Sequence, residues 1–163
     1  MELKIKDGEW LAYDKNGQLE YKRNYKDGKM DGEWLTYYEG GNLKIKENYK
    51  DNKIVGEFLS YYENGLLFKE SFYKDGKADG VHTLWNEDGT LVRKTNWKNN
   101  KLDGEQTHWY DNGQMKTQCN YKYKQREGKS IGWYENGQKH YEDNYEDGML
   151  EGLSMTWREN GRV

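Results

Sequence analysis

Apolar side chains recur along this chain at a constant interval of 24 residues. Offsets are counted from the first glycine of each repeat, which is Gly8 in the first repeat. Offset 5 is always aromatic, and offset 17 is aromatic in every complete repeat; offset 11 is mostly leucine and offset 3 mostly aliphatic. Polar and charged residues fill the positions between them. Such alternation is typical of half-buried β-strands and predicts two strands in each repeat.

Glycines mark the start of each repeat with the same regularity. Self-similarity at a fixed period is the sequence signature of a repeat array. We therefore expect a single repeat domain over residues 1–163, in which the seventh repeat is partial. The repeats start at Gly8, Gly32, Gly56, Gly80, Gly104, Gly128 and Gly152.

The polar joints between the apolar runs predict tight turns. Asn-Gly pairs, which supply two residues of positive φ, favour type I′ turns between antiparallel strands. They occur at 16–17, 64–65, 112–113, 136–137 and 160–161. Asp-Gly pairs mark the other joint, at 27–28, 75–76 and 147–148. The predicted fold is all-β: an elongated single-layer array of antiparallel β-hairpins with a 24-residue period.

The parity of the offsets predicts the two faces of this sheet. Because offsets 3, 5, 11 and 17 are all odd, we expect their side chains to share one face. Met30 and Ile54 precede the next anchor glycine by two residues, which would place them on the other face. A bulge or sharp bend at Gly32, Gly56 and their equivalents would return them to the apolar face.

Composition refines this prediction. Hydrophobic residues make up 33% of the chain and charged residues 34%, and the mean hydropathy is −1.36. Such polarity suits a disordered chain, but aromatic residues reach 15% and stay in register. A net charge of −3 argues against nucleic acid as a partner. Without a transmembrane-length apolar run or an apolar signal segment, a cytoplasmic location is expected.

Candidate catalytic groups do not form a repeated pattern. The three histidines, His82, His108 and His140, occupy three different offsets, and no catalytic motif is present. Cys119 is the only cysteine, so the chain has no intrachain disulfide. It is expected to face away from His108. These observations predict a non-enzymatic protein without a cofactor.

The Asp-Gly-Lys-x-Asp-Gly joints raise the question of a calcium site. In the joint that contains Asp75 and Asp79, Lys77 lies between the two carboxylates. The segment has too few oxygen ligands for a calcium loop. Turn formation explains the same residues, so no metal is expected.

The segments GEFLSYYENGLLFKESFYKDGK and DGEQTHWYDNGQMKTQCNY resemble MORN repeats ("membrane occupation and recognition nexus"). The closest resemblance is to the bacterial variant known as the YwqK-family antitoxin. The resemblance implies a scaffold of β-hairpins that binds a protein partner, with neutralisation of a toxin as one such role. It also implies association with anionic membranes as an alternative. The chain departs from the repeat pattern at Tyr123-Lys124-Gln125-Arg126, so the resemblance does not specify the geometry of that joint.

Two other readings remain open. Trp, paired Tyr and Asp-Gly turns are also features of cell-wall and choline-binding repeats, whose aromatic cages bind quaternary ammonium groups. Lysines such as Lys22, Lys44, Lys46 and Lys94 recur at even offsets and would suit anionic lipid. Acidic residues interrupt that row, which favours a solvated face.

Large aromatic residues at even offsets of the first three repeats form the candidate partner-binding surface. They are Trp10, Trp34, Phe58, Tyr38 and Tyr62. Aromatic residues dominate the binding energy of many interfaces. Stacking that stabilises a one-layer sheet is the competing explanation. Unpaired strand edges template association, which also allows a homodimer through the sheet ends or through this N-terminal face.

Overall fold

The computed structural model describes residues 6–162. All the regular secondary structure in this range is β-strand. These residues form two compact units. The N-terminal unit contains residues 6–78 and 87–89, and the C-terminal unit contains residues 79–86 and 90–162. In both units neighbouring strands are antiparallel, so the predicted all-β fold of hairpin repeats is confirmed.

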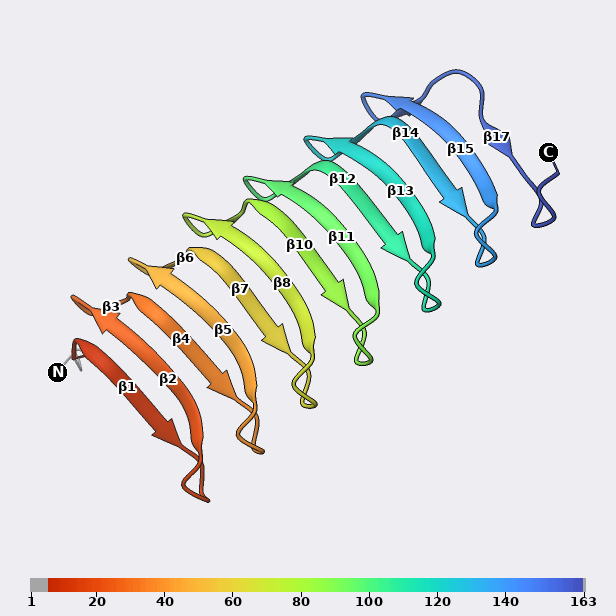
Figure 1. Cartoon of the computed structure of the whole chain (residues 1–163). Helices are drawn as coiled ribbons and strands as arrows, with labels where there is room; N and C mark the ends of the chain where they lie inside the picture. Colours follow the sequence, from red (N-terminus) through yellow and green to blue (C-terminus); the bar gives the residue numbers. More distant parts are fainter. Residues whose placement is uncertain (1–5, 163) are drawn as a thin grey trace. The chain divides into compact units, whose positions relative to one another are not determined.

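Nine strands build the N-terminal unit, three per repeat: two long strands joined as a hairpin and a two-residue strand after them (Figure 1). They are β1 (Gly8–Tyr13), β2 (Leu19–Lys26), β3 (Lys29–Met30), β4 (Gly32–Tyr37), β5 (Leu43–Lys50), β6 (Lys53–Ile54), β7 (Gly56–Tyr61), β8 (Leu67–Lys74) and β9 (Lys77–Ala78).

Eight strands build the C-terminal unit, where two of the short strands merge with the long strand that follows. They are β10 (Gly80–Trp85), β11 (Leu91–Lys98), β12 (Lys101–Trp109), β13 (Met115–Lys122), β14 (Gln125–Trp133), β15 (Lys139–Glu146), β16 (Met149–Leu150) and β17 (Met155–Thr156).

The hairpin register overturns the prediction that the odd offsets share a face. In β4 and β5, Gly32 pairs with Tyr49 and Trp34 pairs with Glu47. Paired offsets therefore sum to 17, an odd number, so an even offset on the first strand faces the same way as an odd offset on the second. The register then shifts between Thr36 and Tyr37. Trp34 and Tyr49 thus lie on one face, where the sequence placed them on opposite faces.

The joint at the Asn-Gly pairs is a three-residue loop, so the predicted type I′ turn is wrong there. Tyr62 N–H donates to Leu66 O (2.8 Å) and Gly65 N–H donates to Tyr62 O (3.0 Å). Gly65 has a φ of 86°, whereas Asn64 has no positive φ. This is a type I turn closed by a glycine in the left-handed region. Asn64 acts through its side chain, since its Oδ1 accepts a hydrogen bond from Leu66 N–H (2.9 Å).

Type I′ geometry occurs instead at the Asp-Gly joints. Both central residues there have positive φ, 51° at Asp27 and 72° at Gly28. The joint that departs from the repeat pattern keeps this geometry, with φ of 51° at Tyr123 and 77° at Lys124. Lys124 N–H donates to Leu102 O (2.8 Å), as Gly76 N–H does to Ile54 O (2.9 Å). Two ordinary L-residues are therefore held in the left-handed region.

Replacing Lys124 by glycine is expected to raise the free energy of unfolding by about 1 kcal/mol, because glycine has no Cβ to strain at positive φ. Urea denaturation followed by circular dichroism measures this. Lys122→Gly, two residues earlier in β13, serves as the control and is expected to destabilise the protein. A Lys124→Gly variant no more stable than the parent would show that this turn is not strained.

The bends predicted at the anchor glycines are confirmed. Gly32, Gly56 and Gly104 have φ of 100°, 72° and 106°, and pairing of β11 with β12 skips from Thr95–Gln106 to Trp97–Leu102. Tyr25 pairs with Met30, so Met30 returns to the face of the offset-17 ring.

An asparagine at offset 16 clamps the bend. Asn24 Nδ2 donates to Glu33 O (2.6 Å), and Asn24 O accepts from Asp31 N–H (3.1 Å). The sequence does contain a signal for this clamp, because offset 16 is asparagine in all complete repeats but the third.

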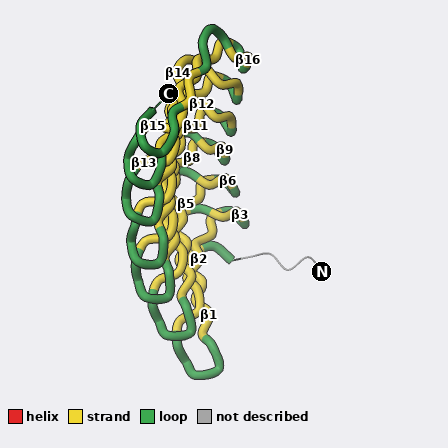
Figure 2. Tube along the Cα trace, turned by 90° about the vertical axis from the view of Figure 1, so that its right-hand side faces the viewer, coloured by secondary structure: helices red, strands yellow, loops and turns green. Residues whose placement is uncertain are grey.

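Side-chain bonds to the backbone link several successive hairpins. In the N-terminal unit, Tyr38 Oη donates to Tyr61 O (2.7 Å) and Asn42 Nδ2 donates to Glu63 O (2.9 Å). These bonds lie at the three-residue loops, on the opposite side of the strands from β3, β6 and β9 (Figure 2). Bonds of this kind hold the repeats in a common register.

The most buried side chains are small. Ser71, Ser130 and Thr83 are 0%, 1% and 2% exposed, whereas Ala78 and Cys119 are the buried apolar residues among those described. A single sheet layer has no second layer against which to bury large side chains. The large rings therefore stay half-exposed on its faces, where they are available for contact.

Candidate functional site

Aromatic rings from successive strands of the N-terminal unit form a continuous row. The ring centroids of Trp10 and Tyr25 are 6.0 Å apart, those of Tyr25 and Trp34 5.5 Å, and those of Trp34 and Tyr49 4.9 Å. Centroid distances of this size are those of interacting aromatic pairs. We call Trp10, Tyr25, Trp34 and Tyr49 the aromatic row, and the side of the sheet that carries it the aromatic face.

Local hydrogen bonds fix the row. Trp34 Nε1–H donates to Asn24 O (3.0 Å), the carbonyl at the bend that precedes β4. Trp10 Nε1–H donates to Lys6 O (2.8 Å), and the Trp10 side chain remains 44% exposed. The centre of the row is therefore packed, whereas its Trp10 end is exposed to solvent.

The five candidate residues fall into two groups. Trp10 and Trp34 join the aromatic row, and Phe58 lies on the same face, with its ring centroid 6.3 Å from that of Tyr73. Tyr38 and Tyr62 lie at the three-residue loops instead. The Tyr38 hydroxyl donates the hydrogen bond to the next hairpin. Tyr38 also borders a depression of about 430 Å³, together with Leu19 and Lys44. The ring of Tyr62 packs against Phe68, with centroids 5.1 Å apart.

Sequence reasoning missed four residues of this face: Tyr25, Tyr49, Arg23 and Glu47. The odd sum of the paired offsets was the signal that would have placed them beside the tryptophans. The Arg23 guanidinium lies 3.9 Å from the ring centroid of Tyr21 and 4.9 Å from that of Trp34. Tyr49 Oη donates to Glu47 Oε2 (3.1 Å). Burial, followed by the nearby Glu47 carboxylate, raises the pKa of Tyr49 to about 12.

The opposite face carries ion pairs between offsets 1 and 14. Lys22 Nζ is 2.8 Å from Glu9 Oε2, and Lys46 Nζ is 3.7 Å from Glu33 Oε2. We call this side the ladder face. Two of the lysines that suggested a lipid-binding row thus have carboxylate partners within the chain. Lys44, a third, lies 5.1 Å from the ring centroid of Tyr38.

The sixth repeat reverses this ion pair. Lys129 Nζ lies 2.7 Å from Glu142 Oε1, and Lys139 Nζ lies 2.5 Å from Glu142 Oε2. Hydrogen bonds from Lys129 and Lys139 lower the pKa of Glu142 from 4.5 to about 2. The first, second and sixth repeats thus pair opposite charges at offsets 1 and 14, with the signs exchanged in the sixth, whereas the third has Glu57 and Glu70 at these offsets.

Acid is expected to remove the contribution of Glu142. A carboxyl group whose pKa is lower in the folded state stabilises the protein above its unfolded pKa, near 4.5, and loses this effect as the pH falls toward about 2. The urea midpoint of Glu142→Gln should thus lie below that of the parent at neutral pH and approach it in acid. Glu135→Gln, in an exposed loop, is the control. A difference that persists at the acid end would contradict this assignment.

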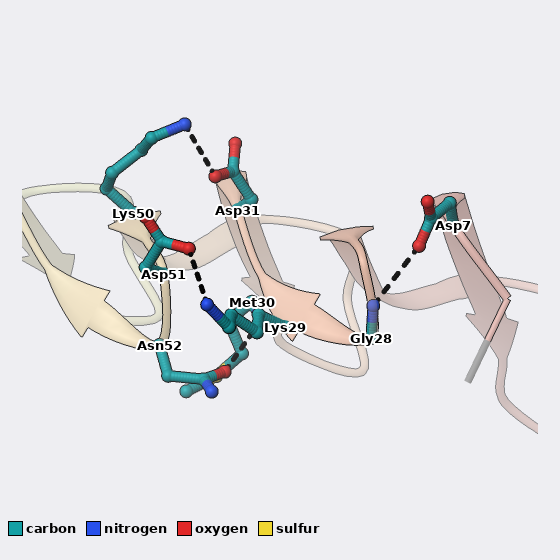
Figure 3. Close-up of polar contacts among 8 residues, drawn as sticks. All are labelled: Asp7, Gly28, Lys29, Met30, Asp31, Lys50, Asp51 and Asn52. Carbon is teal, nitrogen blue, oxygen red and sulfur yellow. Dashed lines mark hydrogen bonds and ion pairs between the residues drawn. The ribbon is translucent and has the colours of Figure 1, made fainter. Parts of the chain in front are cut away.

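The edge formed by the type I′ turns combines acidic and basic side chains (Figure 3). Lys50 Nζ lies 2.8 Å from Asp31 Oδ2, and Lys29 Nζ lies 3.0 Å from Asp51 Oδ1. The hydrogen bond from Lys29 lowers the pKa of the Asp51 carboxyl. Within residues 6–162, no three His, Cys, Asp or Glu side chains converge as metal ligands. The aspartates at these joints hold lysines and backbone amides.

Cys119 and His108 lie on the same face, contrary to the prediction from parity. Cys119 pairs with Gln106, and His108 pairs with Thr117 two residues further along. The Cys119 thiol nevertheless contacts Gln106 Oε1 (4.0 Å), and burial raises its pKa. Burial also lowers the pKa of His108. Both shifts favour the neutral forms, which is the reverse of an activated thiolate–imidazolium pair.

A family model, the MORN repeat variant, matches the chain in six tandem copies. They span residues 6–27, 30–51, 54–75, 78–99, 102–123 and 126–147. A search of curated proteins finds no match. Among the described residues, none forms a helix long and apolar enough to cross a membrane. MORN repeats are non-enzymatic modules that generally bind proteins or membranes. With six copies in tandem covering most of its length, this chain belongs to the MORN repeat variant family.

Proposed function

We propose that this chain is a non-enzymatic interaction module that binds a protein partner through the aromatic face of its N-terminal unit. The observation that carries the proposal is the aromatic row, which ends in the exposed Trp10. Trp and Tyr are enriched among residues that dominate binding energy. Phe58 extends the same face, while Tyr38 and Tyr62 would contact a partner only at its margin, beside the loops.

A protein partner is favoured over an anionic membrane by the arrangement of charge. Lys22 and Lys46, which would have to meet lipid headgroups, already pair with Glu9 and Glu33. Contact with a protein at Trp10, on the other face, would break no ion pair that the described residues form. Sedimentation with anionic vesicles at low salt tests the membrane alternative, which predicts binding that added salt reverses.

Site-specific photocrosslinking tests the proposal. A benzophenone amino acid replaces Phe58 on the aromatic face or Glu57 on the ladder face, in cells that produce the protein naturally. One protein captured from position 58 and absent from position 57 supports the proposal. The purified partner should then bind Trp10→Ser at least tenfold more weakly than the parent, as for an interface anchor. Equal capture from both faces, or unchanged affinity, would refute it.

Neutralisation of a toxin is a narrower form of the same proposal, and it rests only on the resemblance of the sequence to the antitoxin variant. Its test is co-production with the products of neighbouring genes. A product that arrests growth alone but not together with this chain would be the toxin partner. Self-association through the sheet ends or the N-terminal face is the corresponding proposal for a homodimer, and sedimentation equilibrium measures it directly. A cytoplasmic location stays a prediction.

A further inference from the structure

On the aromatic face of the N-terminal unit, Glu47 is a carboxylate surrounded by rings. In the register of β4 and β5 it lies directly opposite Trp34. On the other side of β5, Lys46 pairs with Leu59 of β7. Because the strands are antiparallel, Glu47, which follows Lys46, lies beside Phe58, which precedes Leu59. Tyr49 Oη donates to Glu47 Oε2 (3.1 Å). The Glu47 charge also contributes to the raised pKa of Tyr73.

The cations that the chain places near this carboxylate, Arg23 and Lys69, lie over the neighbouring rings Trp34 and Phe58. Within residues 6–162, Glu47 forms no ion pair, and its side chain is half-buried. Its one hydrogen bond comes from a neutral phenol. A carboxylate on a largely apolar surface gains more from a cationic partner than a fully solvated one, because the local dielectric is lower.

Two of the rings around Glu47 already carry a cation of the chain itself. Arg23 lies over Tyr21 and Trp34, and Lys69 Nζ is 5.1 Å from the ring centroid of Phe58. In the C-terminal unit, Arg126 lies 5.1 Å from the ring centroid of Tyr145 and donates to its hydroxyl (3.0 Å). The faces of electron-rich rings attract ammonium and guanidinium groups at such distances.

We propose that Glu47, with Trp34, Tyr49 and Phe58 around it, receives a cationic side chain, arginine or lysine, from the protein partner. This inference rests on the proposed function and names the chemistry that the partner presents. The guanidinium or ammonium group pairs with the carboxylate, while its flanks lie on the rings. Charge complementarity decides this occupant, because Glu47 is a carboxylate within an aromatic surround that forms no ion pair among the described residues.

Short peptides test the chemistry without knowledge of the partner. Four acetylated and amidated peptides differ only at the central residue, which is arginine, lysine, norleucine or citrulline, the neutral analogue of arginine. The indole N–H signals of Trp10 and Trp34 in the NMR spectrum report binding to the intact chain. The arginine and lysine peptides should shift the Trp34 signal with millimolar affinity. The citrulline peptide should bind at least tenfold more weakly, because a charge-assisted hydrogen bond is lost.

Two matched variants locate the effect. Glu47→Gln keeps the shape and an acceptor for Tyr49, and should lower the affinity for the arginine peptide about tenfold without changing that for citrulline. Glu57→Gln, one residue from Phe58 but on the ladder face, should bind like the parent. No shift with arginine, equal binding of arginine and citrulline, or an unchanged Glu47→Gln affinity would each overturn the inference.

The photocrosslinked partner separates this inference from the proposed function. If Glu47→Gln binds the partner like the parent while Trp10→Ser loses it, the aromatic face is the interface and the cation site is refuted. If both variants bind like the parent, the proposed function itself fails. If both variants bind the partner more weakly than the parent, the proposed function and the cation site are both supported.

Discussion

Replacing Trp34 by serine is expected to lower the free energy of unfolding by about 3 kcal/mol. The Trp34 ring contacts both Tyr25 and Tyr49, and its Nε1–H satisfies Asn24 O at the bend between repeats. Serine removes both ring contacts and leaves that carbonyl without this donor. Urea denaturation followed by far-ultraviolet circular dichroism measures the loss.

Trp10→Ser is the matched control, because Trp10 occupies the same offset in the first repeat. Its ring has one neighbour in the row, Tyr25, and is 44% exposed. We expect its replacement to lower the free energy of unfolding by no more than about 1 kcal/mol, in line with the smaller area it buries. Equal losses for the two variants would mean that the row does not stabilise the sheet at its centre.

A serine at Gly132 is expected to destabilise the protein by about 2 kcal/mol. Gly132 pairs with Tyr141 across β14 and β15, and a Cβ at Gly132 would lie 2.1 Å from Tyr141 Cε1. Gly132 has no positive φ, so the effect comes from the space that the ring occupies. To accept a side chain, Tyr141 must swing away and give up its contact with His140, whose ring centroid is 5.7 Å distant.

A second substitution at the partner position tests this explanation. In β7 and β8 the same pair of offsets is Ser60 opposite Lys69. Gly132→Ser combined with Tyr141→Lys reproduces that pair, and should lose less stability than the sum of the two single changes. Thermal unfolding of all four proteins gives the coupling energy. Strict additivity would show that Tyr141 does not hold the position of Gly132.

Periodicity carried most of the fold prediction. The 24-residue spacing, the two strands per repeat and the bends at Gly32 and Gly56 could be predicted because each depends on local pattern and on glycine's tolerance of positive φ. The turn types could not be assigned from dipeptides alone. Asn64-Gly65 belongs to a three-residue loop in which only Gly65 needs positive φ, whereas Asp27-Gly28 needs it at both residues.

The faces of the sheet depend on pairing between strands, which the repeat pattern does not specify. A loop one residue longer reverses which offsets lie together, since side chains alternate along each strand. The sequence therefore identified Trp10, Trp34 and Phe58 as candidates but placed Tyr25 and Tyr49 on the wrong side. The same error hid Arg23 and Glu47, whose surroundings become visible only through the register of β4 with β5.

The bonds between hairpins also determine how the protein can change in length. Tyr38 and Asn42 each bond a carbonyl of the following hairpin, 23 and 21 residues further along. Because every such link belongs to the same 24-residue interval, insertion or deletion of one whole interval leaves each surviving joint with its usual neighbours. One interval adds two long strands, about 10 Å of sheet. The surface offered to a partner can thus grow or shrink in whole repeats, without redesign of any turn.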